Sequence, residues 1–121
     1  MNFIEQIKWL DLKIKLIYLY FLVYDETLQY LDSENEGWIY DLRSKALVVP
    51  MDMEVVLLQY EEKKKRLFYL EEALGHCIIL KGSLIRSGTL GHLNEKNITM
   101  LIKKNNQVIR LIEKMLNDKC M

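Results

Sequence analysis

The sequence is poor in the residues that interrupt helices and in those that cross-link small folds. One proline and five glycines in 121 residues are few for a fold with many tight turns, so this composition favours long helices. Two cysteines, Cys77 and Cys120, cannot form a disulfide framework. We therefore expect reduced thiols and a cytoplasmic protein.

The chain also lacks an excess of charge of either sign and a long apolar run. Seventeen basic residues balance seventeen acidic ones, so contact with nucleic acid or a membrane would need a local patch. The longest uninterrupted apolar run, Leu16 to Tyr24, is far shorter than the roughly 20 residues of a membrane-spanning helix. The N-terminus has no basic start typical of a signal peptide. These features predict a soluble protein that does not contact a membrane.

What the sequence does contain is apolar material in helical patterns. Half of the residues are apolar and 28% are charged, which is typical of one domain with a true core, here residues 1–121. No internal repeat and no strand–turn–strand pattern interrupts the helical spacing. We predict an all-α fold, an antiparallel helical bundle of three long helices plus one or two short helices.

The first predicted helix, from about residue 2 to 32, carries two apolar stripes. At about 100° per residue these stripes lie on opposite sides of the helix. Such a helix must be covered twice, so either it runs through the middle of the bundle, or one side is core and the other meets a partner chain. The first stripe comprises Phe3, Ile7, Leu10, Ile14, Ile17, Phe21, Tyr24, Leu28 and Leu31, and the second comprises Trp9, Leu12, Leu16, Leu19 and Val23.

Local signals place the remaining helix boundaries. Ser33 and Glu36 have the spacing of a capping box, which predicts a short helix over about 34–46 that Pro50 closes. A second long helix is expected to begin at Asp52 and to stop at Gly82. Asn94 is expected to cap the last helix, which is locally basic.

Most motifs that carry chemistry are missing. The sequence has no glycine-rich nucleotide-binding fingerprint, no zinc-protease motif and no paired Cys-x-x-Cys. Two histidines and two scattered cysteines do not form a zinc set, so we expect neither a metal nor a cofactor. His76 and Cys77 are adjacent on a predicted helix and point about 100° apart, so we interpret Cys77 as a core residue.

One stretch, S-L-I-R-S-G-T-L-G-H-L-N from Ser83 to Asn94, combines Arg86 with His92. This spacing resembles the HEPN family of small helical bundles, whose signature is an arginine followed after four to six residues by a histidine near the last helices. The resemblance covers residues 82–116 and implies metal-independent RNA cleavage by Arg86 and His92, often at a dimer cleft, in toxin–antitoxin and phage-defence systems. It departs from the family at Ser87, where a polar Asn, His or Asp is usual, and at the glycines within the motif.

The chemistry of these two residue types is compatible with that implication. A histidine titrates near neutral pH and can move a proton, and an arginine can bind a phosphate as charge develops on it. The basic final helix, with Lys103, Lys104 and Arg110, would then hold the RNA backbone. The structural alternative is a glycine-rich corner in which Arg86 is a surface cation and His92 precedes the helix cap.

Two functions from different classes follow from these patterns. The first is a non-catalytic protein that binds another protein, or a second copy of itself, through the first helix, as immunity proteins, antitoxins, phage inhibitors and small complex subunits do. The alternative is the HEPN-like ribonuclease, the only reading in which RNA is bound. Aromatic residues are expected partner contacts, because buried Trp and Tyr dominate interface energetics. The acidic segment is either a solvated connection or a docking surface for a basic partner. The candidate contacts are Trp9, Tyr18, Tyr20, Trp38, Glu34, Glu36 and Asp41.

Overall fold

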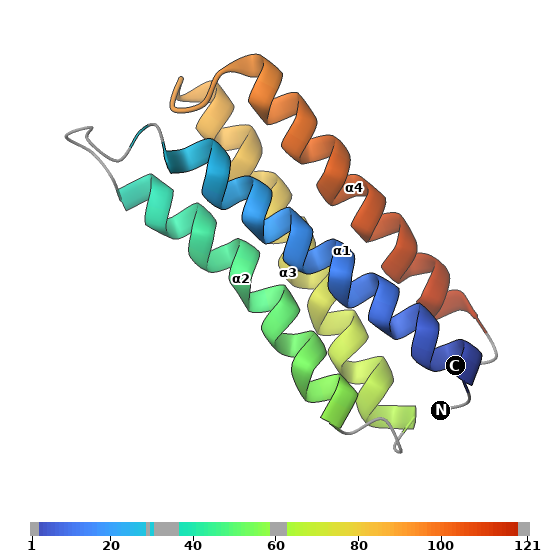
Figure 1. Ribbon diagram of the computed structural model, residues 1–121. Helices are drawn as coiled ribbons and strands as arrows, with labels where there is room; N and C mark the ends of the chain where they lie inside the picture. The colour runs from blue at the N-terminus through green and yellow to red at the C-terminus, as the bar shows by residue number, and fades with distance from the viewer. Residues whose placement is uncertain (1–2, 29, 31–36, 59–62, 119–121) are drawn as a thin grey trace.

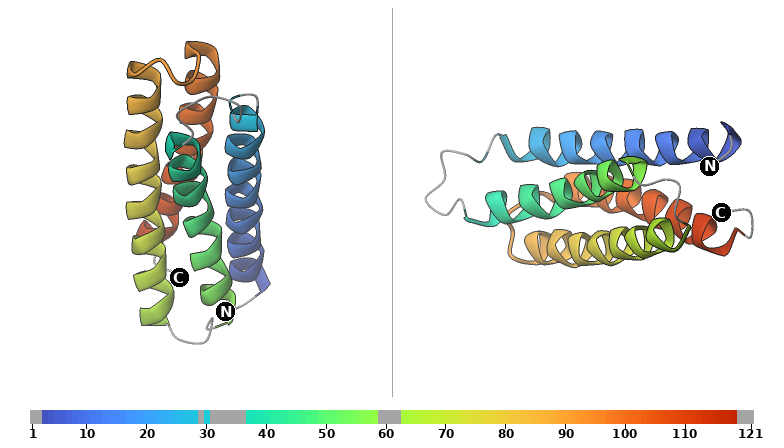
Figure 2. Two further views of the ribbon diagram at one scale, coloured as in Figure 1. Left: turned by 90° about the vertical axis from the view of Figure 1, so that its left-hand side faces the viewer. Right: turned by 90° about the horizontal axis from the view of Figure 1, so that it is seen from below.

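The chain folds as four helices in a ring. The computed structural model describes residues 3–28, 30, 37–58 and 63–118, and all regular structure in these ranges is α-helical. Helices α1 (Phe3–Leu28), α2 (Gly37–Leu58), α3 (Lys63–Thr89) and α4 (Glu95–Asn117) alternate in direction (Figure 1). Each packs on two neighbours, so α1 touches α2 and α4, and α3 lies diagonally opposite (Figure 2). The all-α bundle is confirmed, but the described residues form four long helices, and the arrangement of three long and one or two short helices is not confirmed.

The second helix differs from the sequence expectation. We expected a short helix over 34–46, closed by Pro50, and a new helix from Asp52, but α2 runs through both positions. Proline lacks the amide that would bond the carbonyl four residues earlier, a loss of about 3 kcal/mol in a helix interior. The buried residues Ile39, Leu42, Ala46 and Val49 continue helical spacing up to Pro50. Tertiary packing of this face outweighs the local penalty.

The third helix also continues past its expected end. Gly82 was predicted to stop it, but α3 extends to Thr89 because buried positions recur at helical spacing beyond the glycine. The true stop is Gly91, whose φ of 75° is in the left-handed region. There the amide of His92 donates to the carbonyl of Ser87 (2.9 Å) and that of Gly91 to the carbonyl of Gly88 (3.1 Å). This pattern is a Schellman cap, which satisfies the last carbonyls of α3.

The start of the fourth helix is as predicted. Asn94 has extended backbone angles, and its side-chain oxygen accepts a hydrogen bond from the amide of Asn97 at 2.8 Å. Glu95 occupies the first turn, where a carboxylate complements the helix dipole. The cap and the Schellman turn together hold residues 90–94 as a tight corner between α3 and α4.

The core lies on one side of α1 only. Its members on α1 are Trp9, Leu12, Leu16, Leu19 and Val23, the second stripe of the sequence. They pack against buried residues of α2, α3 and α4. The alternative in which the first helix runs through the middle of the bundle is therefore wrong, because α1 is one of four peripheral helices.

The C-terminal end of α1 is tied to α2 through one arginine. Arg43 Nε donates to the buried Thr27 hydroxyl at 2.8 Å, and its Nη2 donates to the carbonyl of Tyr24 at 3.2 Å. The guanidinium also lies 4.1 Å from the centre of the Tyr24 ring. These contacts join α2 to the last turns of α1, and they fix the position of Tyr24 on the outer side of α1.

Candidate functional site

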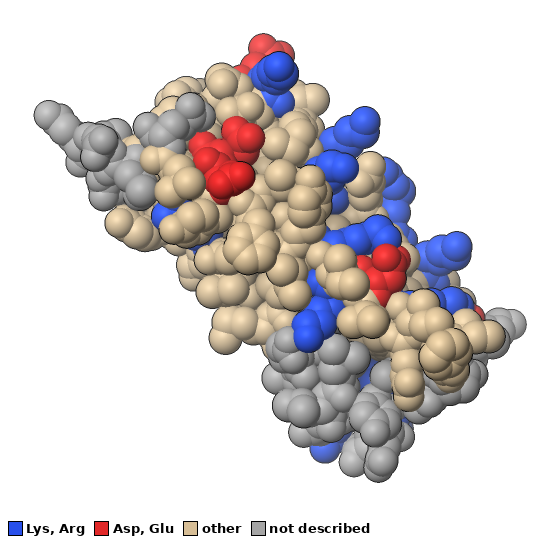
Figure 3. Space-filling view, viewed as in Figure 1, with Lys and Arg blue, Asp and Glu red and all other residues tan. Residues whose placement is uncertain are grey.

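The outer side of α1 is an apolar face that the rest of the described chain leaves uncovered. Its nine large side chains are between 39% and 75% exposed. We call this set the α1 face; it consists of Phe3, Ile4, Ile7, Leu10, Ile14, Tyr18, Phe21, Tyr24 and Leu28. Figure 3 shows the side of the molecule that carries α1, where uncharged surface dominates the centre.

The α1 face is larger than the apolar patches of ordinary monomers. Side chains of this size expose on the order of 100 Å² each at half exposure, so the face presents roughly 800 to 900 Å². The largest apolar patch on a typical monomer measures about 300–600 Å². The face, continuous along one helix, therefore exceeds the apolar patch that an ordinary monomer exposes.

Charged groups lie along the edges of the face, and Asp11 shares one edge with Ile4 and Tyr18. Lys15 Nζ bonds Asp11 Oδ2 at 2.5 Å, one turn away on α1. Lys8 Nζ bonds Asp118 Oδ2 at 3.0 Å and so links the start of α1 to the end of α4. These exposed pairs contribute little stability, but they keep the rim of the face polar.

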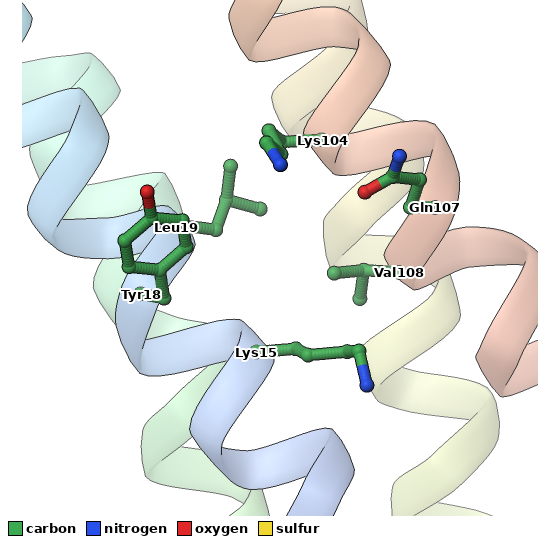
Figure 4. A pocket seen from close by; sticks show the side chains of 6 residues that line it. All are labelled: Lys15, Tyr18, Leu19, Lys104, Gln107 and Val108. Carbon is green, nitrogen blue, oxygen red and sulfur yellow. The ribbon is translucent and has the colours of Figure 1, made fainter.

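A groove of about 170 Å³ separates α1 from α4 beside the face. Figure 4 shows Lys15 and Tyr18 of α1 on one side and Lys104, Gln107 and Val108 of α4 on the other. Blue side chains follow this edge of the molecule in Figure 3. The α1 face is therefore bordered by cations on its α4 side.

The second candidate site is a pocket of about 400 Å³ where α2 begins and α3 ends. Arg86 and His92 both line it, Arg86 from the last turn of α3 and His92 from the corner after Gly91. The sequence-predicted pair therefore does open onto one cavity. The other lining residues are Gly37, Trp38, Asp41, Ser83, Ser87 and Leu90.

Aromatic stacking holds His92 in place. The rings of Trp38 and His92 stack with centres 4.8 Å apart and planes 22° from parallel, and Tyr30 meets Trp38 edge-on at 5.5 Å. The Nδ1 atom of His92 is buried and has no hydrogen-bond partner. A buried polar atom without a partner is unfavourable, and its burial keeps this nitrogen out of the open part of the pocket.

Asp41, the acidic residue that lines the pocket, pairs with Lys45 of the same helix. Lys45 Nζ donates to Asp41 Oδ2 at 2.9 Å and to Ser83 Oγ at 2.7 Å. Asp41 therefore opposes an anion less than an unpaired carboxylate would. With Arg86 exposed at the rim, the pocket can hold an anionic group beside the imidazole of His92.

The other sequence-predicted contact residues are scattered over the fold. Trp9 is 1% exposed and lies in the core, so no partner can reach it, and Tyr20 packs partly buried against the core. Tyr18 is exposed on the α1 face, and Trp38 and Asp41 line the pocket. Glu34 and Glu36 lie outside the described residues.

The basic residues proposed for RNA lie apart from the Arg86–His92 pocket. Lys103 and Arg110 line a shallow hollow of about 330 Å³ on the outer side of α4. Lys104 lies instead in the groove beside α1. They do not line the pocket, so an RNA strand would have to pass over α4 to touch both places.

The structure offers no metal site in the ranges that it describes. No group of three or more potential metal-ligating side chains from His, Cys, Asp and Glu comes together there. Cys77 is buried in α3, as expected, and burial raises the pKa of its thiol to about 12. No described helix is long and apolar enough to cross a membrane.

Sequence reasoning missed part of the pocket. Lys45 and the buried Ser83 and Ser87 carry no motif, and Trp38 lies far from His92 along the chain. Only the packing of α2 on α3 brings them together. No family model matches the chain, and neither does any curated protein or solved structure. The resemblance to the HEPN family thus rests on Arg86, His92 and the sequence around them alone.

Proposed function

We propose that this protein acts by binding another polypeptide through the α1 face and has no catalytic role of its own. The observation that carries the proposal is the exposure of nine large apolar side chains along one helix. Keeping such a face in water is unfavourable by about 25 cal/mol for each Å², so a partner that covers it gains a large hydrophobic contribution.

The spacing of the face favours a helical partner. Phe3, Ile7, Leu10 and Ile14 recur at intervals of four and three residues, and the pattern continues through Phe21, Tyr24 and Leu28. An apolar stripe of this kind binds a partner in one of two ways: it packs against a second helix in a coiled coil, or it lies in an apolar groove of the partner. Immunity proteins, antitoxins, phage inhibitors and small subunits of complexes act through such surfaces, and we place this protein in that functional class.

Site-directed photo-crosslinking in the cells that carry the gene tests the proposal. A photoreactive amino acid replaces Ile14 on the α1 face, or Ile78 on α3, which is exposed to the same degree (56% and 55%) on the opposite side of the bundle. We expect covalent adducts with a polypeptide at position 14 and few at position 78. Equal adduct yields at both positions, or none at position 14, would reject the α1 face as the binding surface.

A metal-independent ribonuclease is the second candidate function. One specific observation favours it: Arg86 and His92 line the same pocket. In this reading His92 transfers a proton to or from the reacting oxygen, and Arg86 stabilises charge on the phosphate.

A cleavage assay in EDTA separates the two candidates. Wild type, Arg86→Ala and His92→Ala are incubated with single-stranded RNA, and Lys64→Ala, an exposed cation at the opposite end of α3 from Arg86, serves as the cationic control outside the pocket. Under the ribonuclease reading, the two pocket variants lose at least about 100-fold in rate, as is usual when general acid–base catalysis is removed. The same rate in all four proteins would eliminate the ribonuclease.

A further inference from the structure

We propose that the polypeptide covering the α1 face is a second copy of this chain, whose α1 packs antiparallel about a twofold axis near residues 15–16. This inference rests on the proposed function, because it names the partner of the same surface. A twofold dimer requires a surface that is complementary to itself when turned around. The α1 face meets that requirement in the spacing, size and charge of its residues.

The spacing provides the seam of a coiled coil. Ile7, Ile14, Phe21 and Leu28 fall on one heptad position, and Phe3, Leu10, Ile17 and Tyr24 fall on the other core position. The two positions alternate along the whole of α1. Two such stripes can therefore remain in contact over the full length of the helix.

The sizes of the side chains favour the antiparallel orientation. With the axis near residues 15–16, each residue of one heptad position faces the other position of the second copy. The facing pairs are Phe3 with Leu28, Ile7 with Tyr24, Leu10 with Phe21 and Ile14 with Ile17. All of these residues belong to the α1 face except Ile17, which is half-buried at its edge. Three of the four layers then combine an aromatic with an aliphatic residue, so the layers have similar thickness.

A parallel arrangement would distribute the same residues unevenly. It would place Phe3, Phe21 and Tyr24 on their own copies, and the aliphatic residues Ile7, Leu10 and Ile14 on their own copies between these aromatic layers. Close packing at the aliphatic layers would then conflict with the wider aromatic layers, and unfilled volume in a core is destabilising. Even layer thickness is therefore an argument for the antiparallel dimer.

The charges beside the stripe do not oppose antiparallel pairing. At the flanking positions, Asp11 of one copy lies opposite Tyr18 of the other, and Asp25 lies opposite Ile4. On the other flank, Lys13 lies opposite Tyr20. No like charges meet at these positions, and each Tyr18 hydroxyl is placed to donate to an Asp11 carboxylate.

The area is sufficient for a stable dimer. The α1 face exposes roughly 800 to 900 Å², and a specific interface of standard size buries about 800 Å² on each partner. The face is also more apolar than an average interface, as is typical of homodimers. A second copy therefore covers the face without help from a further protein.

Sedimentation equilibrium of the purified full chain is the first test. At about 50 µM chain, well above the micromolar limit of interfaces of this size, the wild type should have twice the 14.5 kDa mass of one chain. Ile14→Glu should weaken the dimer by more than about 100-fold, because it buries a carboxylate near the axis in each copy. The matched control Ile78→Glu should remain dimeric. A monomeric wild type, or an Ile14→Glu variant that stays dimeric, would overturn the inference.

Disulfide trapping tests the orientation. In a Cys120→Ser background, Leu10→Cys and Phe21→Cys chains of different tag length are mixed and oxidised. Cys77 does not interfere, because burial raises the pKa of its thiol to about 12 and keeps it protonated. Antiparallel pairing should give mainly the mixed Leu10→Cys/Phe21→Cys disulfide. Predominant disulfides between identical chains would indicate parallel pairing and contradict the inference.

The outcomes separate this inference from the proposed function. If the purified chain is monomeric and the photoreactive residue at position 14 forms adducts with a different polypeptide, the second copy is wrong and the binding function stands. If the chain is monomeric and position 14 forms no adducts, both are wrong. Adducts that contain only peptides of this chain support both.

Discussion

The two sides of α1 are built from similar residues and lie in opposite environments. On one side Trp9, Leu12 and Leu16 are at most 1% exposed, whereas on the other side the α1 face is 39% to 75% exposed. Hydropathy does not distinguish them, because both sides carry large aliphatic and aromatic residues at helical spacing. The difference arises from the ring of four helices, in which each helix has neighbours on its inner side only.

The periodicity of apolar residues identifies which residues share a face of a helix, but it does not identify what covers that face. A bundle of four helices has enough surface to bury one side of each helix. The bundle does not need a second apolar side on α1 in order to fold. We therefore propose that this side binds another polypeptide. If this is correct, residues on the two sides should respond differently to the same substitution.

The largest expected difference is in stability. Leu16→Ala should lower the free energy of unfolding by about 2–5 kcal/mol, because it creates a cavity in the core. Ile14→Ala should lower it by less than about 1 kcal/mol in chemical denaturation at nanomolar chain concentration, where mass action favours the monomer. Comparable losses for both variants would mean that the two sides of α1 are equally buried, which would contradict the fold.

The next largest effect is the pH dependence of stability that the buried Cys77 thiol causes, which tests whether water reaches the core. Cys77 packs in the same core as the inner side of α1, and burial raises the pKa of its thiol from 9.0 to about 12. The unfolded chain releases this proton at lower pH than the folded one, so the contribution of Cys77 to stability is complete below pH 9 and is lost as pH rises toward 12. The loss should be about 1.4 kcal/mol per pH unit in that window.

Cys77→Ala is the reference for that measurement. The difference in unfolding free energy between wild type and Cys77→Ala is followed by urea denaturation from pH 8 to pH 11, which cancels the titration of other groups. The wild type should lose stability relative to the variant above pH 9. A difference that does not change with pH would show that water reaches the thiol and that this core is not dry.

A smaller effect concerns the outer side. If a second copy covers the α1 face, the melting temperature of the wild type should rise by several degrees when the chain concentration increases 100-fold, because association stabilises the folded state by mass action. The melting temperature of Ile14→Glu should not depend on concentration, and that of Ile78→Glu should behave like wild type. Calorimetry provides all three values, and identical slopes for all three would contradict a role for the face.

The smallest expected effect lies on the rim. Asp11 and Lys15 form an exposed pair one helical turn apart. Asp11→Asn should change the free energy of unfolding by less than about 0.5 kcal/mol, since exposed pairs of this kind contribute little. Equilibrium denaturation at nanomolar chain concentration measures it. A loss above 1 kcal/mol would mean that the rim is part of the folded core.

Elements with a strong local signal could be predicted from the sequence. The helical spacing predicts a first helix over about residues 2–32 with two apolar faces, and α1 has both faces but ends at Leu28. The cap at Asn94 predicts the start of α4. The boundaries inside α2 and α3 could not be predicted in this way. Pro50 and Gly82 are unfavourable in helices, yet buried neighbours at helical spacing continue both helices through them.

The candidate sites were predictable to different degrees. The sequence placed Arg86 and His92 near each other, and the structure brings both onto one pocket. It could not reveal that Trp38 stacks on His92 or that Lys45 pairs with Asp41, because these contacts depend on how α2 packs against α3. It showed two apolar sides of α1 but not which of them is the core, because that choice depends on the other three helices.

The most direct test of the account is whether the α1 face is covered in living cells. A membrane-permeant maleimide labels Leu10→Cys on the α1 face and Ile78→Cys on α3, two positions of similar exposure, in the Cys120→Ser background, and each rate is divided by the rate of the denatured chain. The account predicts that Leu10→Cys reacts at least tenfold more slowly than Ile78→Cys. Equal rates would show that the apolar side of α1 faces water in the cell and would contradict the central claim.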